Sequence, residues 1–173
     1  MSQIPYLVVA IGCPSSGKST VGGILREKGF VHLCTDDIRN KLFDNPDFLV
    51  YRSAPDFSQN EKLVQEELWS QKYEALSHGN NVYIDSCADR ESWRNGLLNT
   101  GDIEANKYLL ELQVVEPILR DRNLARNRPN DVYGEWSERW EPPKTEPGII
   151  HIAYQNNTLQ NLEFITQDLS KRF

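Results

Sequence analysis

The residues best placed to do chemistry form one short pattern near the start of the chain, G-x-x-x-x-G-K-S/T. This pattern is the phosphate-binding loop, in which backbone amides and a helix N-terminus direct positive partial charge at a phosphate. We expect Lys18 to reach the β- and γ-phosphates of a nucleoside triphosphate and the Ser19 hydroxyl to coordinate Mg²⁺. The predicted phosphate-contacting residues are Gly12, Cys13, Pro14, Ser15, Ser16, Gly17, Lys18, Ser19 and Thr20. ATP and Mg²⁺ are therefore the predicted cofactors.

A second candidate site is the segment Thr35-Asp36-Asp37-Ile38-Arg39, which directly follows a short apolar stretch. A kinase that phosphorylates a hydroxyl needs a carboxylate to accept or orient its proton, and Asp36 is suitably placed. Arg39 lies three residues later, on the same face of a helix. Thr35 or Asp36 as a simple helix cap is the structural alternative, but the phosphate loop upstream favours a functional role.

A third candidate is Asp85, which ends the apolar run Val82-Tyr83-Ile84. An acidic residue at the end of a buried strand in a phosphate-loop protein helps bind Mg²⁺ or orients the substrate. Helix capping by the same carboxylate is the alternative. Glu116, which follows another predicted strand, is a weaker rival. We therefore predict a metal site formed by Ser19 and Asp85.

Four arginines occur between residues 120 and 128, although the chain is acidic overall. Arg122 and Arg126 are four residues apart and so share one helix face. Arginines on a lid can neutralise charge on a transferring phosphoryl group. A solvated basic face is the alternative. We predict an arginine-bearing lid over about residues 117–140.

Predicted strands and helices alternate along the sequence, and these elements must position the candidate residues. The pattern predicts strands at 4–11, 31–34, 82–85, 108–115 and 149–153, and helices at 18–28, 36–43, 60–78, 90–99, 117–127 and 158–171. A polar loop is expected between 43 and 60. Such alternation is typical of an α/β protein whose parallel sheet is covered on both faces. The prediction is one domain over residues 1–173, with a five-stranded parallel sheet and the phosphate loop after its first strand.

Composition limits the classes of protein to consider. The chain has 173 residues, 39% hydrophobic content and a formal net charge of −6. The negative charge argues against holding long nucleic acid by bulk electrostatics, although a short end in a local basic groove remains compatible. No apolar run approaches the roughly 20 residues that span a bilayer. Three cysteines without metal-type spacing favour a cytoplasmic location.

Together these motifs resemble one family, the kinase domain of phage-type polynucleotide 5′-kinases. The matching segments are Ile11–Thr20, Asp36-Asp37-Ile38-Arg39, Val82–Asp85, the Arg122/Arg126 pair and residues 140–148. The resemblance implies that Asp36 is the general base toward a 5′-hydroxyl and that Arg39 contacts a substrate phosphate. It also implies that partner phosphatase or ligase activities reside on other chains. Ser86-Cys87-Ala88 departs from the Thr-Asn that usually follows the aspartate in this family.

Three functions remain open from the sequence. The first is transfer of the γ-phosphate to the 5′-hydroxyl of RNA or DNA, with Lys18, Asp36, Arg39, Asp85, Arg122 and Arg126 as catalytic residues. The second is a kinase of a small molecule such as a nucleoside, sugar or antibiotic. The third is a nucleotide-switched regulatory module with little transferase activity. Residues 123–130, together with Gln155 and Asn156, are the segments expected near the nucleotide base, and the choice between ATP and GTP stays open.

Overall fold

The chain alternates β-strands and α-helices, as the sequence pattern predicts. The structure is a computed structural model that describes residues 3–44, 48–126, 132–144 and 146–173. The strands are β1 (Tyr6–Ile11), β2 (Val31–Cys34), β3 (Val82–Asp85), β4 (Asn106–Gln113) and β5 (Ile149–Gln155). The helices are α1 (Lys18–Glu27), α2 (Thr35–Phe43), α3 (Phe48–Ser53), α4 (Phe57–Ser77), α5 (Glu91–Leu98), α6 (Glu116–Leu124), α7 (Val132–Ser137) and α8 (Leu159–Arg172).

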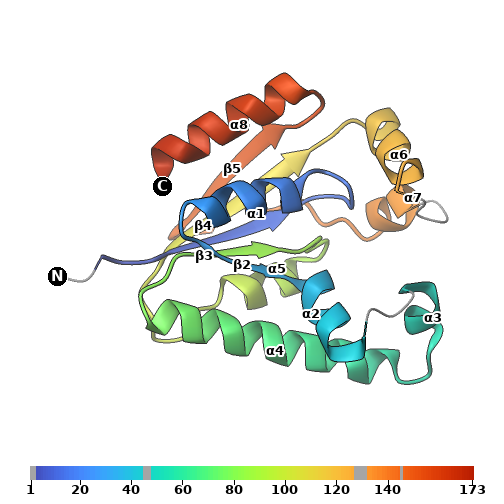
Figure 1. Cartoon of the computed structure of the whole chain (residues 1–173), viewed down its shortest axis with the longest axis horizontal. Coiled ribbons are helices and arrows are strands. Elements are labelled where there is room, and N and C mark those ends of the chain that lie inside the picture. The colour runs from blue at the N-terminus through green and yellow to red at the C-terminus, as the bar shows by residue number, and fades with distance from the viewer. Residues whose placement is uncertain (1–2, 45–47, 127–131, 145) are drawn as a thin grey trace.

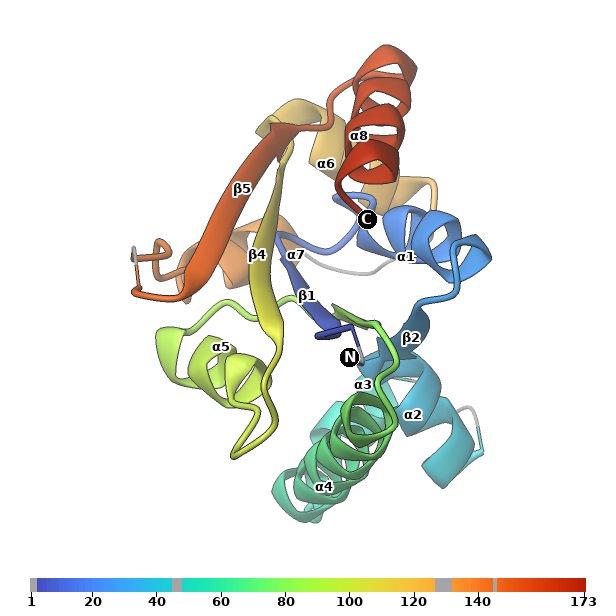
Figure 2. The same ribbon diagram turned by 90° about the vertical axis from the view of Figure 1, so that its left-hand side faces the viewer.

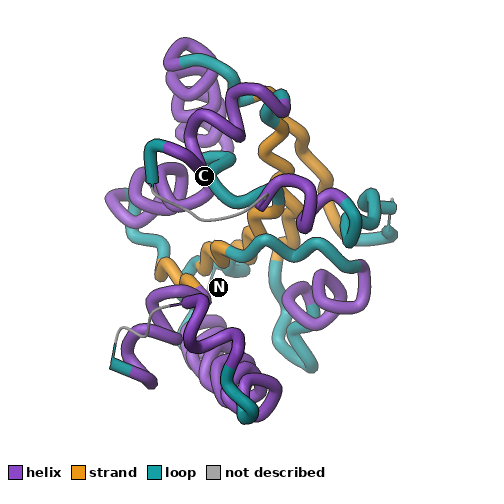
Figure 3. Tube along the Cα trace, turned by 90° about the vertical axis from the view of Figure 1, so that its right-hand side faces the viewer, coloured by secondary structure: helices purple, strands orange, loops and turns teal. Residues whose placement is uncertain are grey.

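All five strands of the sheet run parallel, in the order β2-β3-β1-β4-β5. Helices α1 and α8 lie on one face, and α4 and α5 lie on the other (Figures 1 and 2). Strand β1 is central and pairs with β3 on one side and β4 on the other, and the connection from β3 to β4 crosses it. Ligands of open α/β sheets bind at such a switch point, beyond the carboxyl ends of the strands. Figure 3 views the molecule from that edge.

The central strands are buried on both faces, which explains their continuous apolar sequences. Leu7, Val9 and Ile11 of β1 pack under α4 and α5, whereas Val8 and Ala10 pack under α1 and α8. Every one of these five side chains is at most 1% exposed. The phosphate loop therefore starts from a strand that is buried on both faces of the sheet. None of the helices within the described ranges is both long and apolar enough to cross a membrane.

The structure departs from the predicted elements mainly at two short helices. Helix α3 lies where the sequence predicts a polar loop, and α7 lies within the predicted lid. Strand β4 begins and ends two residues earlier than predicted, at Asn106 and Gln113. The helix predicted over 117–127 is α6, which ends at Leu124. Asn127 and Arg128 lie outside the described residues, as do the other residues of 127–131, so the lid prediction is described only on either side of them.

Lys72 of α4 is completely buried, and its side chain caps the C-terminus of the adjacent helix α5. Its ammonium group donates to the backbone oxygens of Gly96, Leu97 and Asn99 at 3.1, 3.3 and 2.6 Å. Carbonyls at a helix C-terminus have no partner within the helix, and a lysine can satisfy them. Burial, with a smaller effect of Lys107, lowers the pKa of Lys72 to about 8.

We expect Lys72→Met to destabilise the fold by about 1–3 kcal/mol, because three buried carbonyl groups lose their donor. The unfolded chain holds the Lys72 proton more tightly than the folded chain does. The stability of the wild type relative to Lys72→Met should therefore increase as the pH rises from about 8 toward 10.5. Urea unfolding of both proteins at about pH 7 and about pH 10 measures this difference. Equal stability of the two proteins at both values would contradict the capping role.

Candidate active site

The phosphate loop follows β1 and bends sharply at two glycines. Gly12 has a φ of 141° and Gly17 a φ of 101°, conformations that side chains disfavour. Space is also restricted, since a Cβ atom on Gly12 would lie 2.6 Å from the Leu112 oxygen and one on Gly17 would lie 2.3 Å from Nδ2 of Asn156. The two fixed glycines of the pattern are thus required by close packing as well as by backbone conformation.

Lys18 opens α1 and lies over the loop, with only 6% of its surface exposed. Its Nζ donates to the backbone oxygens of Gly12 and Cys13, both at 3.0 Å. The backbone oxygen of Lys18 in turn accepts a 2.7 Å hydrogen bond from the buried phenol of Tyr83. The ammonium group is consequently placed within the concave side of the loop, where phosphates bind in this class of loop.

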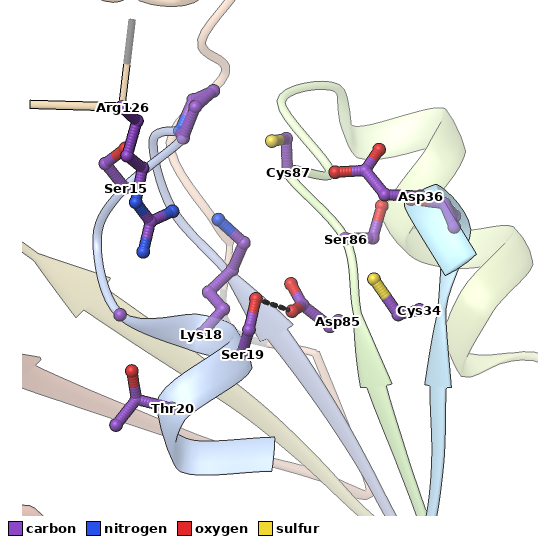
Figure 4. Close-up of a pocket in the computed structure, with 13 residues that line it drawn as sticks. Ser15, Lys18, Ser19, Thr20, Cys34, Asp36, Asp85, Ser86, Cys87 and Arg126 are labelled. Atoms are coloured by element: carbon purple, nitrogen blue, oxygen red, sulfur yellow. Dashed lines mark hydrogen bonds between the residues drawn. The ribbon is translucent and has the colours of Figure 1, made fainter. Parts of the chain in front are cut away.

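Ser19 and Asp85 meet directly, although they are far apart in sequence. The Ser19 hydroxyl donates to Oδ2 of Asp85 at 2.6 Å, and the Asp85 residue is 6% exposed (Figure 4). Hydroxyl and carboxylate oxygens are the hard donors that Mg²⁺ prefers, and this ion takes its remaining ligands from water and phosphates. The donor set therefore fits the predicted metal site. The rival acid Glu116 instead forms an ion pair with Arg120.

His32 lies beneath this pair, with Nε2 at 4.0 Å from Oδ2 of Asp85. Burial lowers the pKa of His32, while the charge of Asp85 acts in the opposite direction. Cys34 is Asp85's neighbour in the strand register. Burial and the Asp85 charge raise the pKa of its thiol to about 12. A raised thiol pKa disfavours the thiolate, which is the nucleophilic form of cysteine.

Asp36 occupies the first turn of α2, across the pocket from the phosphate loop (Figure 4). Its side chain is 65% exposed, and Oδ1 accepts a 2.6 Å hydrogen bond from Nη1 of Arg39. One pocket collects Asp36 with Lys18, Ser19 and Asp85. The Asp36 carboxylate thus lies in the same pocket as the phosphate loop and the metal-binding pair, as the sequence pattern predicts.

Arg39, for which the resemblance implies a contact with a substrate phosphate, is largely buried beside two carboxylates. The residue is 8% exposed, and its guanidinium group contacts Glu61 of α4 as well as Asp36. Burial opposes the charge on Arg39, but the hydrogen bonds and charges of Glu61 and Asp36 raise its pKa above the ordinary value. Arg39 therefore organises the carboxylates of this region.

The two predicted lid arginines also occupy different positions. Arg126 lines the pocket. Arg122 instead donates to the backbone oxygen of Asn156 at 3.0 Å and to that of Ser15 at 3.5 Å. Burial, followed by repulsion from Arg126, lowers the pKa of Arg122. Of the two, Arg126 lies at the pocket, and Arg122 ties α6 to the phosphate loop.

Two asparagines complete this attachment of the loop, and the sequence indicates neither role. Ser15 has a φ of 68°, and its hydroxyl donates to Oδ1 of Asn123 at 2.7 Å. The Nδ2 amide of Asn156, a residue expected near the nucleotide base, donates to the Ser16 backbone oxygen at 2.7 Å. These contacts join residues more than 100 positions apart, which local sequence patterns do not reveal.

The pocket is lined further by Thr35, Ser86 and Cys87, in addition to the predicted residues. Ser86 is held by a 3.0 Å hydrogen bond from the Trp93 indole. Within the described residues, no group of three or more histidine, cysteine or acidic side chains is placed to hold a metal ion. The Ser19–Asp85 pair offers one hydroxyl and one carboxylate oxygen, a partial set that phosphate oxygens and water would complete around Mg²⁺.

A central parallel strand that leads into a phosphate loop, with the lysine, hydroxyl and carboxylate placed as described, defines the P-loop kinase fold. Residues 7–139 match the family described as AAA domain. The match covers well over half of the chain, so the chain belongs to this family. A search of curated proteins found no relative of this chain.

Solved structures share the fold over most of the chain. A candidate kinase from Chloroflexus aurantiacus J-10-fl is 17% identical, with a TM-score of 0.72 over 99% of this chain and 100% of the other. A gluconokinase from Sinorhizobium meliloti 1021 is 18% identical, with a TM-score of 0.58 over 98% of each chain. A chain of the Pnkp1/Rnl/Hen1 complex is 18% identical, with a TM-score of 0.54 over 85% of this chain and 43% of the other.

Proposed function

We propose that this protein transfers the γ-phosphate of ATP to a hydroxyl group. The observation that carries the proposal is that one pocket contains the phosphate-loop lysine, the Ser19–Asp85 pair and the carboxylate of Asp36. A nucleotide-binding module that only binds and releases ATP has no need of a base opposite its phosphate loop. Phosphoryl transfer requires that arrangement, because the acceptor hydroxyl must lose a proton as it attacks.

In this mechanism, Lys18 and the loop amides hold the β- and γ-phosphates and offset their charge. Mg²⁺ held by Ser19 and Asp85 would neutralise further negative charge on the phosphates. Asp36 accepts the proton of the acceptor hydroxyl, whose oxygen forms the new bond to the γ-phosphorus while the bond to the ADP oxygen breaks. Arg126 stabilises the charge of the group in transfer, and Arg122 supports the loop from α6.

For the acceptor, we propose the 5′-hydroxyl of RNA or DNA. The support is the Asp36-x-x-Arg39 segment and its resemblance to polynucleotide 5′-kinases, together with the fold shared with a chain of the Pnkp1/Rnl/Hen1 complex. On this proposal, a phosphatase or ligase that acts on the same ends resides on a separate chain. A cytoplasmic location, where ATP is abundant, accords with this activity.

A small-molecule hydroxyl is the second candidate acceptor, and one contact favours it. Glu61 neutralises much of the charge that Arg39 would offer to a nucleic-acid phosphate. The gluconokinase structure has the same fold and covers nearly the whole chain. Asp36 lines the pocket edge, and an acceptor without a phosphate, such as a sugar, could bind there through hydrogen bonds of its hydroxyl groups rather than through charge.

The deciding experiment measures the transfer of labelled phosphate from γ-labelled ATP to candidate acceptors in the presence of Mg²⁺. Single-stranded RNA and DNA oligonucleotides with 5′-hydroxyl ends are assayed beside gluconate, other sugars and nucleosides. Labelled oligonucleotide would support the polynucleotide proposal, and a labelled small acceptor would favour the second candidate. Nucleotide binding without transfer to any acceptor would overturn the kinase proposal.

A further inference from the structure

Glu61, in the second turn of α4, forms a bidentate ion pair with the guanidinium group of Arg39. Oε1 of Glu61 accepts from Nε at 2.8 Å, and Oε2 accepts from Nη2 at 3.1 Å. This is the two-pronged geometry in which arginine and carboxylate bind most specifically. On its other side, the same guanidinium donates from Nη1 to Asp36 at 2.6 Å. One cation therefore bridges two carboxylates on two different helices.

Helix α3 supplies a further contact to this bridge. The Tyr51 residue is 5% exposed, and its hydroxyl donates to Oε1 of Glu61 at 2.9 Å. Its ring lies 5.6 Å from the Arg39 guanidinium carbon, close enough for a cation–π contact. The ring is itself packed between Phe43 and Phe57, with centroids at 5.3 and 5.5 Å. Glu61 is thus fixed from α3 as well as from α2.

We propose that Glu61 is a positioning residue for the catalytic base, because it fixes Arg39 and through Arg39 fixes the carboxylate of Asp36. This inference rests on the proposed kinase function. Asp36 itself is largely exposed, so packing against neighbouring side chains does little to hold its carboxylate toward an acceptor. Its orientation comes instead from the Arg39 contact, and that contact is held in place by Glu61 and Tyr51.

Removing the Glu61 charge has a direct consequence for Asp36. A buried arginine needs a partner for its charge, and of the two carboxylates that the described residues place on Arg39, only Asp36 is left once Glu61 is neutral. The guanidinium would then turn toward Asp36 and draw the carboxylate away from the acceptor hydroxyl. A displacement of about 1 Å in such a group lowers rates by roughly 10²-fold. The expected loss is in the chemical step, since Glu61 does not line the nucleotide pocket.

The first test is Glu61→Gln, assayed with ATP and the acceptor that the wild type labels. We expect kcat to fall by about 10- to 100-fold, with the KM for ATP close to wild type, in assays run well below the melting temperature of the variant. Glu66→Gln is the matched control on the same helix, because Glu66 is exposed and pairs only loosely with Lys62 at 3.7 Å. Tyr51→Phe, which removes only the hydroxyl, should produce a smaller fall in kcat.

A double-mutant cycle with Arg39→Gln separates positioning from general destabilisation. If Glu61 acts through Arg39, Glu61→Gln adds almost no further loss of kcat in the Arg39→Gln background. Losses that multiply, or an unchanged kcat in both Glu61→Gln and Tyr51→Phe, would overturn the inference while leaving the kinase proposal intact. A wild type that phosphorylates none of the acceptors would instead overturn the kinase proposal and this inference with it.

Discussion

Asp36→Ala should reduce phosphoryl transfer by about 10²- to 10⁴-fold, the range that general-base residues supply. ATP affinity should change little, because Asp36 makes its 2.6 Å contact with Arg39 and none of its hydrogen bonds in the described structure involve the phosphate loop. Single-turnover transfer and equilibrium binding of ATP measure the two effects separately. The loss should appear in kcat, because Asp36 accepts the acceptor's proton only in the transition state.

Asp37→Asn is the matched control for this variant. Asp37 neighbours Asp36 in the first turn of α2 and does not line the pocket. A near-wild-type rate is expected, so any effect of removing one negative charge from the helix N-terminus is accounted for. Full activity of Asp36→Ala, or an equal loss in both variants, would remove Asp36 from the role of base.

The sequence alone predicts the parts of the site that depend on local pattern. The glycines and lysine of the phosphate loop are fixed by backbone geometry within eight residues, so a short motif is sufficient to find them. Asp36 and Asp85 follow from a simple rule, namely that parallel strands carry functional groups at their carboxyl ends. The same rule places Ser19 beside Asp85, and the structure brings the two within hydrogen-bonding distance.

The contacts that hold these groups in position depend on tertiary structure and are not visible in the sequence. Glu61 is one of several acidic residues on α4, and nothing in its spacing separates it from the exposed Glu66. Its role depends on α3, a six-residue helix too short to be marked by hydrophobic periodicity. That helix is held by the aromatic contacts of Tyr51, which join segments on either side of it. The sequence accordingly predicts a substrate contact for Arg39 but gives no sign of the Glu61 contact that holds it beside Asp36.

Lys18→Ala should abolish transfer, with a fall of at least about 10³-fold, and should also weaken ATP binding. Lys18 is buried inside the loop, with its ammonium group 3.0 Å from two loop carbonyls, so its charge is fixed where the phosphates bind. Lys28→Ala is the matched control, because Lys28 follows the same helix but is exposed and contacts the Ser170 backbone oxygen at 3.5 Å, away from the pocket. Transfer and ATP binding are measured on both, with melting temperatures to exclude misfolding.

Comparison of Lys18→Ala with Asp36→Ala distinguishes a kinase from a nucleotide-controlled switch. A kinase and a nucleotide-controlled switch would both need Lys18, since each must hold the triphosphate. Only the kinase needs Asp36, because a switch releases no proton from an acceptor hydroxyl. Loss of transfer in both variants, with ATP binding lost in Lys18→Ala alone, is the pattern expected for a kinase. Substantial transfer by Lys18→Ala would show that the phosphate loop is not the donor site.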